Sequence, residues 1–389
     1  MSSFSQDQTQ SELVEIFKTE YSNLIAVLSH YYHVSDLQLA EDIVSETFVR
    51  AMKAWSHKGV PQYPNAWLRK VAQNLYYEHL RKQKTFEEKV APAYGGEVII
   101  PASLEITEEV IADSQLRMIF VICDPALNTS SQLCSALRIL CGFTTEEIAN
   151  ALISNKESVN KKLYRAKMEL RDLLSPDKEL SKEDYQDRLD NVLRVIYLIF
   201  NEGYYSTTSE VNIRHDFCWE AMRLAIFLTK QSLFDLSPVY ALLAIMCFHG
   251  SRIAARDEGE SGAVLYDEQD RSKWNFELIA KGQQYLKRAS ASEKVSKYHI
   301  EAAIAYWHTG DHPDKWDQIL MLYNKLLTIE YSPVIAMNRT YALAKAQSPK
   351  KAIQEALKLD LHTNAHYHCL LAELYKMNHE QDNEINSLT

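Results

Sequence analysis

The sequence predicts an all-α protein in which two small helical domains, the second a helix-turn-helix, are joined by a flexible linker and followed by a helical, TPR-like repeat domain. Three observations predict this class. Apolar residues recur at helical spacing along most of the 389 residues. Glycine and proline, ten of each, are sparse and gather in a few breaks between the apolar runs. The length corresponds to two or three domains at roughly 100–200 residues each.

Residues 1–84 are expected to form the first helical domain. Its second apolar run, LAEDIVSETFVRAMKAW, has an opposite, acidic face that carries Glu41, Asp42 and Glu46. A loop over residues 57–65 contains one glycine and two prolines. The helix after this loop ends in a basic cluster of Arg81, Lys82 and Lys84.

Residues 85–110 are expected to form the linker, because they hold a glycine pair, two prolines and an acidic bias. The second domain, residues 111–175, contains the segment TTEEIANALISNKESVNKKLYRAKMEL. Thr144 or Thr145 is a plausible N-cap there, with Glu147 placed for a capping box. A short helix, a tight turn and a longer basic helix follow, which is the order of a helix-turn-helix.

Residues 188–389 read as helical segments of about 12–16 residues with short breaks. Two stretches, starting at YHIEAAIAYW and at SPVIAMNRTY, each predict a helical hairpin, and a weaker third unit begins at HYHCLLAELYK. Such recurrence favours stacked helical repeats. Because the repeats are few and imperfect, an irregular helical bundle is the alternative.

The longer helix of the helix-turn-helix is the first candidate site. Its cationic side chains can neutralise DNA phosphates, and Ser158 near its first turn can face base edges. The candidate residues for this contact are Lys156, Ser158, Lys161, Lys162 and Arg165. A solvated basic helix without DNA is the alternative, since short helix-turn-helix patterns give many false matches.

The segment PNAWLRKVAQNLYYEHLRKQK, residues 64–84, is the second candidate site, because it interleaves aromatic, basic and amide side chains. Aromatic rings can stack on unpaired bases while cations neutralise the backbone. Gln73 and Asn74 could read an extruded base edge. Trp67 and Leu75 could equally be core residues, whereas Tyr76 and Tyr77 cannot both face inward.

Composition limits the function classes. The formal charge of -10 excludes a generally basic nucleic-acid binder, so DNA contact must come from local patches, and an acidic surface suits a basic protein partner. The six cysteines form no C-x-x-C pair and are expected to be free, mostly buried thiols of a cytoplasmic protein. The N-terminus shows no signal pattern.

We find no phosphate loop, H-E-x-x-H or nucleophile elbow, so no enzyme activity, cofactor or metal is expected.

These segments carry a family resemblance. LQLAEDIVSETFVRAMKAW followed by PNAWLRKVAQNLYYEHLRK resembles region 2 of extracytoplasmic-function RNA polymerase sigma factors of the sigma-70 family. TTEEIANALISNKESVNKKLYRAKMELR resembles their region 4. LRMIFVICDPAL, RVIYLIFNEGYY and LYDEQDRSKW resemble the subgroup with a C-terminal TPR-like extension.

The resemblance implies core RNA polymerase and promoter DNA as partners. It places a surface for docking on the polymerase at Asp42, Glu46 and Arg50. It implies that region 2 recognises and melts the -10 element, and that the 156–167 helix reads the -35 element. The implied -10 residues are Lys58, Tyr63, Trp67, Arg69, Lys70, Gln73, Asn74, Tyr77 and Arg81. The linker would thread the polymerase towards the RNA exit path.

Two positions depart from the family pattern. Glu78, followed by His79, stands where region 2 usually has Asp, and Asp124 stands where the subgroup commonly has His.

The extension has distinctive polar patches at residues 201–204 and 267–274, for which helix capping or internal hydrogen bonding is the alternative. Our hypothesis is that the extension regulates the sigma module. The rival interpretation is a helix-turn-helix regulator with a helical sensor domain that does not act through polymerase.

Overall fold

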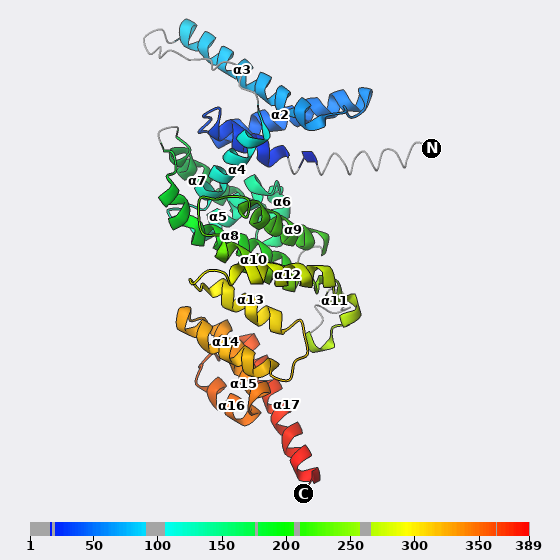
Figure 1. Cartoon of the computed structure of the whole chain (residues 1–389). Coiled ribbons are helices and arrows are strands. Elements are labelled where there is room, and N and C mark those ends of the chain that lie inside the picture. Colours follow the sequence, from blue (N-terminus) through cyan, green and yellow to red (C-terminus); the bar gives the residue numbers. More distant parts are fainter. Residues whose placement is uncertain are drawn as a thin grey trace, which may run out of the picture. The chain divides into compact units, whose positions relative to one another are not determined.

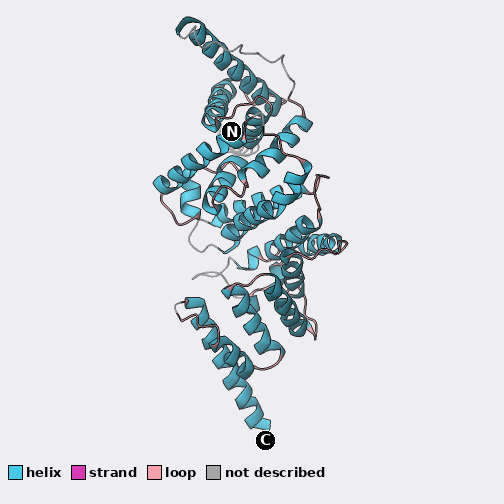
Figure 2. Cartoon of the chain, turned by 90° about the vertical axis from the view of Figure 1, so that its left-hand side faces the viewer, coloured by secondary structure: helices cyan, strands magenta, loops and turns pink. Residues whose placement is uncertain are grey.

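The computed structural model describes residues 16–17, 20–90, 106–175, 178–205, 211–256, 266–362 and 364–388. Every regular element within these ranges is a helix, which confirms the predicted all-α class (Figure 2). The chain divides into two compact units, residues 1–220 and residues 221–389. No helix in the described part of the chain combines the length and the apolar character needed to cross a membrane.

The first helices of unit 1 enclose a small apolar core. Residues 20–30 are helical, and α2 (Leu37–Lys58) and α3 (Pro64–Val90) follow (Figure 1). The Asp36 carboxylate accepts the Gln38 N–H and begins α2, because it satisfies one of the unpaired donors of the first turn. At the other end Gly59, with φ 76°, ends α2 in a conformation that favours glycine.

The segment expected as a linker is partly helical. Helix α3 continues to Val90, six residues past the expected end of the first domain, and α4 (Glu108–Ile122) begins inside its last three residues. The side chain of Thr107 caps α4. Residues 91–105 lie outside the described residues. The division into domains at residues 84, 110 and 175 therefore stays a prediction.

The helix-turn-helix consists of α6 (Thr145–Ala151) and α7 (Lys156–Leu173), supported by α5 (Thr129–Ser135) and a π-helical turn (Ala136–Leu140). Thr144 is the N-cap of α6, and the reciprocal bonds between Thr144 and Glu147 form the predicted capping box. Ile153 turns the chain with φ 47°, and Asn155 caps α7.

Helix α8 (Lys182–Tyr205) packs on α4 and α5, so the first helix of the C-terminal extension belongs to unit 1. Asp124 anchors this contact: one carboxylate oxygen accepts the Ala126 N–H at 2.8 Å, and the other lies 2.5 Å from Arg188 on α8. Asp124 therefore acts as a turn cap and an ion-pair partner. Helix α9 (Val211–Leu228) follows, and its Phe217 ring packs on Phe143 at a centroid distance of 4.4 Å.

Unit 2 is a run of antiparallel helices in which most neighbours in sequence also pack in space (Figure 1). The helices are α10 (Ser237–Gly250), α11 (Ile253–Arg256), α12 (Phe276–Ala289), α13 (Lys297–Trp307), α14 (Lys315–Ile329), α15 (Pro333–Ala346), α16 (Pro349–Leu357) and α17 (Ala365–Leu388), with 3-10 turns at Tyr266–Glu268 and Arg271–Lys273. The two predicted hairpins are confirmed as α13–α14 and α15–α16. Helices α10 and α12 approach closely at Gly282, where a Cβ would lie 2.6 Å from the Phe248 ring.

Candidate nucleic-acid interface

Helix α7 presents a cationic outer face. Val159, Leu163, Ala166 and Leu170 are buried, which fixes the opposite face outward. Of the predicted DNA-contacting residues, Lys156, Lys161 and Arg165 are exposed, and Ser158 and Lys162 are half-buried at the edge of this face. Lys161 pairs with Glu157 one turn earlier at 2.7 Å, an exposed pair that a phosphate can displace at little cost. Lys161 and Arg165, about one turn apart, therefore lie together on the outward side of the helix, whereas Lys156 belongs to its first turn.

Tyr164 was missed by the sequence reasoning. It is 67% exposed on the same outward face, next to Arg165, and Met168 one turn later is 53% exposed. An exposed tyrosine beside cations suits contact with DNA sugars and phosphates, which tyrosine hydroxyls also bind. The apolar Leu163 directly before it could have indicated that Tyr164 faces outward, since adjacent helical residues point about 100° apart.

Lys167 points the other way and joins α7 to α2 within unit 1. Its ammonium donates to the carboxylate of Glu41 on α2, and to the Gln38 side chain at 2.9 Å. Arg138 donates to the same carboxylate at 3.1 Å, and the Tyr21 hydroxyl donates to it at 2.9 Å. Three donors thus converge on one carboxylate.

Glu41 is therefore not part of the outward acidic face on which the sequence placed it. Only 6% of the residue is exposed, because α7 packs against α2 at this position. Burial, followed by the Glu41 charge, raises the pKa of the Tyr21 phenol above its ordinary range, so Tyr21 remains a hydrogen-bond donor. Helical spacing gives the direction of a side chain relative to its own helix, but it does not show whether another helix packs over that side chain.

The rest of the acidic strip on α2 is open to solvent. Asp42, Glu46 and Arg50, the predicted polymerase-docking residues, are all exposed and follow one another at four-residue spacing. Arg50 pairs with Glu46 at 2.9 Å and approaches Glu78 on α3 at 3.7 Å. Glu78, the residue that departs from the family pattern, also pairs with Lys82 at 3.0 Å. The strip can therefore exchange its weak exposed pairs for those of a partner protein.

The predicted DNA-contacting residues on α3 differ in their solvent exposure. Lys70, Asn74 and Arg81 are exposed, and Trp67 and Tyr77 are half-buried. Tyr76 is the buried member of the tyrosine pair, in agreement with the expectation that both could not face inward. Lys58, the last residue of α2, and Tyr63, in the loop before α3, are exposed, Tyr63 at 68%. These exposed residues form the part of the predicted -10 surface that solvent reaches.

Two predicted residues on α3 have internal partners instead. Gln73 is 6% exposed, and its amide donates to the Tyr32 hydroxyl at 2.9 Å, so in this structure it packs the core and does not face a base. The guanidinium of Arg69 lies between the carboxylates of Glu20, at 3.2 Å, and Glu108, at 2.7 Å. This pairing raises the pKa of Arg69 and ties α3 to the start of α4.

The polar patches of the extension also have internal contacts. Tyr204 is buried with its ring stacked on Phe200, and burial raises the pKa of the half-buried Glu202 carboxyl. In the 267–274 segment, Asp270 caps the following turn through Ser272, and Arg271 pairs with Asp311. Capping and internal hydrogen bonding therefore account for part of the 267–274 patch, as the alternative interpretation expected.

The chain is similar to known proteins along most of its length. Residues 16–86 match the model of sigma-70 region 2, and residues 188–290 match a family of unknown function, DUF6596. An uncharacterized protein of Rhizobium meliloti is 31% identical over 351 residues, which cover 88% of this chain and 82% of that protein. No solved structure matches the chain.

Two further relatives are similar to part of the chain. The ECF RNA polymerase sigma factor BldN of Streptomyces coelicolor is 30% identical over 151 residues, covering 38% of this chain and 55% of that protein. The ECF RNA polymerase sigma factor SigX of Bacillus subtilis is 21% identical over 179 residues, covering 44% of this chain and 86% of that protein.

Proposed function

This chain belongs to the extracytoplasmic-function sigma factors of the sigma-70 family, in the subgroup with a C-terminal TPR-like extension, and we propose that it directs core RNA polymerase to specific promoters and starts transcription there. The observation that carries the proposal is that one compact unit holds both an exposed acidic strip on α2 and an exposed basic face on α7. The first suits a basic protein surface and the second suits DNA.

In this proposal each exposed surface has one role. Asp42, Glu46 and Arg50 contact the polymerase. The outer face of α7 binds phosphates and base edges of the -35 element, with Tyr164 added to the predicted residues. Lys58, Tyr63 and Asn74 lie where a base flipped from the -10 element would be held, and Lys70 and Arg81 neutralise the adjacent backbone.

Weak binding by each module explains why polymerase is needed. Extruding a base costs a few kcal/mol, and a small helical module with a handful of phosphate contacts recovers only part of it. The overall charge of -10 opposes association of the free chain with DNA. Polymerase holds both modules at one promoter, and linked binding of two modules exceeds the affinity of either alone.

Binding measurements with purified core RNA polymerase test this function against its rival. We expect the full chain to bind the core enzyme and to bind promoter-length duplex DNA tightly only in its presence. A helix-turn-helix regulator independent of polymerase would bind duplex DNA by itself and leave the core enzyme unbound. Fluorescence anisotropy with labelled DNA, with and without core enzyme, distinguishes the two directly.

We also propose that the helices of unit 2 regulate the sigma module. A truncation that tests this must keep α8, because cutting near residue 175 would expose the apolar residues with which α8 packs on α4 and α5. A chain ending at Leu228 retains all of unit 1 and keeps α9 whole. We expect its promoter-dependent transcription with core polymerase to differ from that of the full chain. Equal output from the two chains, with the truncated chain shown by circular dichroism to be folded, would remove the regulatory proposal.

A further inference from the structure

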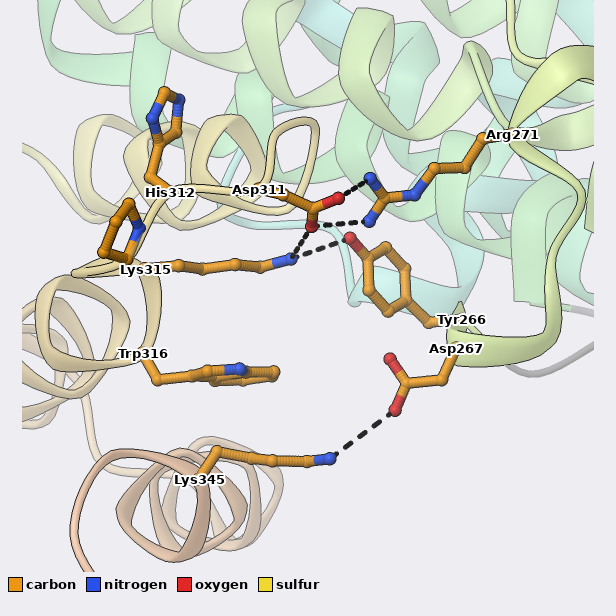
Figure 3. A pocket seen from close by; sticks show the side chains of 9 residues that line it. Tyr266, Asp267, Arg271, Asp311, His312, Lys315, Trp316 and Lys345 are labelled. Atoms are coloured by element: carbon orange, nitrogen blue, oxygen red, sulfur yellow. Dashed lines mark hydrogen bonds and ion pairs between the residues drawn. The ribbon is translucent and has the colours of Figure 1, made fainter.

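Unit 2 contains a cavity of about 460 Å³ between the 3-10 segment at 266–273 and helices α14 and α15 (Figure 3). That volume is within the range of pockets that hold small molecules. Its wall combines aromatic rings with charged groups of both signs. The charged side chains are Arg271, Lys315, Lys345, Asp267 and Asp311, and the rings of Tyr266 and Trp316 lie between them.

Lys315 is the most unusual group in this wall. Its side chain is 8% exposed, although an ammonium group carries three hydrogen-bond donors. Within the described residues, its one acceptor at hydrogen-bonding distance is the Tyr266 hydroxyl, at 3.0 Å. The nearest carboxylate oxygen, on Asp311, is 3.9 Å away. Buried charges in proteins are normally paired and fully hydrogen-bonded, so this ammonium has unused capacity for an anion.

The two carboxylates of the wall are already engaged by other partners. Arg271 donates two bonds to Asp311, one of them at 2.8 Å, and this pairing lowers the pKa of Asp311. Lys345 lies 3.8 Å from Asp267, which also accepts from the Tyr341 hydroxyl at 3.4 Å. Counting three cations and two carboxylates, with His312 counted as neutral, the wall has a net charge of +1. That charge matches a monoanion.

The aromatic rings indicate the shape of the rest of the ligand. The Lys315 ammonium lies 5.0 Å from the Tyr266 ring centre and 5.6 Å from that of Trp316, so both rings border the position of an anion bound to it. His308 packs edge-on against the same two rings, and burial lowers its pKa to about 3, so it adds no charge. Its buried Nδ1 has no partner among the described residues. Flat aromatic walls favour a planar ligand.

We propose that this cavity binds a small aromatic carboxylate, with its carboxylate on the Lys315 ammonium and its ring beside Tyr266 and Trp316. A phosphate group fits less well, because it carries about -1.5 to -2 charges near neutral pH and Asp267 and Asp311 would repel the second charge. Through such a site a small molecule would bind to unit 2. It is independent of the proposed role in transcription, and either can fail without the other.

Calorimetric titration of the full chain with benzoate and indole-3-carboxylate tests the site. We expect at least one of them to bind, and Lys315→Met to weaken that binding by about tenfold or more, because the apolar side chain keeps the shape and removes the charge. Lys325→Met, at an exposed position on the same helix, should leave the affinity unchanged. Loss of a buried, underbonded ammonium should preserve or raise the melting temperature, so a folding defect will not mimic the result.

Neutral and ring-free probes complete the experiment. Benzamide, acetate and inorganic phosphate should each bind about tenfold more weakly than the aryl carboxylate. Benzamide binding as tightly as benzoate would overturn the role of the charge, and acetate doing so would overturn the role of the rings. Tighter binding of phosphate would overturn the choice of carboxylate. Absence of binding by both aryl carboxylates, or equal affinity in Lys315→Met, would overturn the site itself.

Discussion

Replacing Asp42 and Glu46 together by lysine is expected to weaken binding of the chain to core RNA polymerase by about 100-fold, because like charges brought together at an interface cost several kcal/mol. Both carboxylates are exposed on α2, and their partners among the described residues are the surface side chains of Gln38 and Arg50. Exposed pairs of this kind contribute about 0–1 kcal/mol, so the fold should survive the change. Gel filtration or anisotropy with purified core enzyme measures the effect.

A matched charge reversal provides the control. Asp187 and Asp190 are exposed on α8 at three-residue spacing, and replacing both by lysine changes the net charge by the same amount. This variant should bind core polymerase within a factor of about three of the unmodified chain, since rim and remote charges have small effects. If both variants lose affinity equally, overall charge governs the association and the strip on α2 is not the docking surface.

Replacing Glu41 by alanine is expected to lower the free energy of unfolding of unit 1 by about 3 kcal/mol, because removing one member of a buried ionic cluster leaves the others unpaired. Arg138, Lys167 and Tyr21 all donate to this carboxylate. Chemical denaturation followed by circular dichroism measures the change. The cluster holds α2 against α7, so the loss should appear in the transition of unit 1.

Two further variants isolate the Glu41 contact. Glu46→Ala removes an exposed carboxylate from the same helix and should cost less than about 1 kcal/mol. A double-mutant cycle of Glu41→Ala with Lys167→Ala should give a coupling energy between about 0.5 and 3 kcal/mol, as contacting residues do. Additive effects in the cycle would mean that the two helices are not held together by this pair.

Local sequence signals were sufficient wherever a structure depends on neighbouring residues. The Thr144–Glu147 capping box, the turn at Ile153 and the hairpins of unit 2 follow from capping chemistry and helical spacing alone. The exposure of Lys161 and Arg165 follows in the same way, because the buried positions of α7 recur at regular spacing.

Contacts between distant segments were beyond such signals. Glu41 and Gln73 read as outward polar residues, yet each is covered by partners far away in sequence, such as Lys167 and Tyr32. The role of Asp124 became visible only when Arg188 on α8 was placed next to it. Likewise, the cavity around Lys315 brings together residues 266–271, 311–316 and 345, which are separate segments of the chain, and no motif marks it.

Run-off transcription with purified core RNA polymerase on a library of promoter fragments tests the central claim most directly. The account predicts that the full chain makes the core enzyme start RNA synthesis at defined sites. Paired changes at Lys161 and Arg165 to alanine should weaken this reaction and reduce its salt dependence, because two phosphate contacts are lost. If core enzyme with the full chain started no transcript that core enzyme alone does not start, the account would be contradicted.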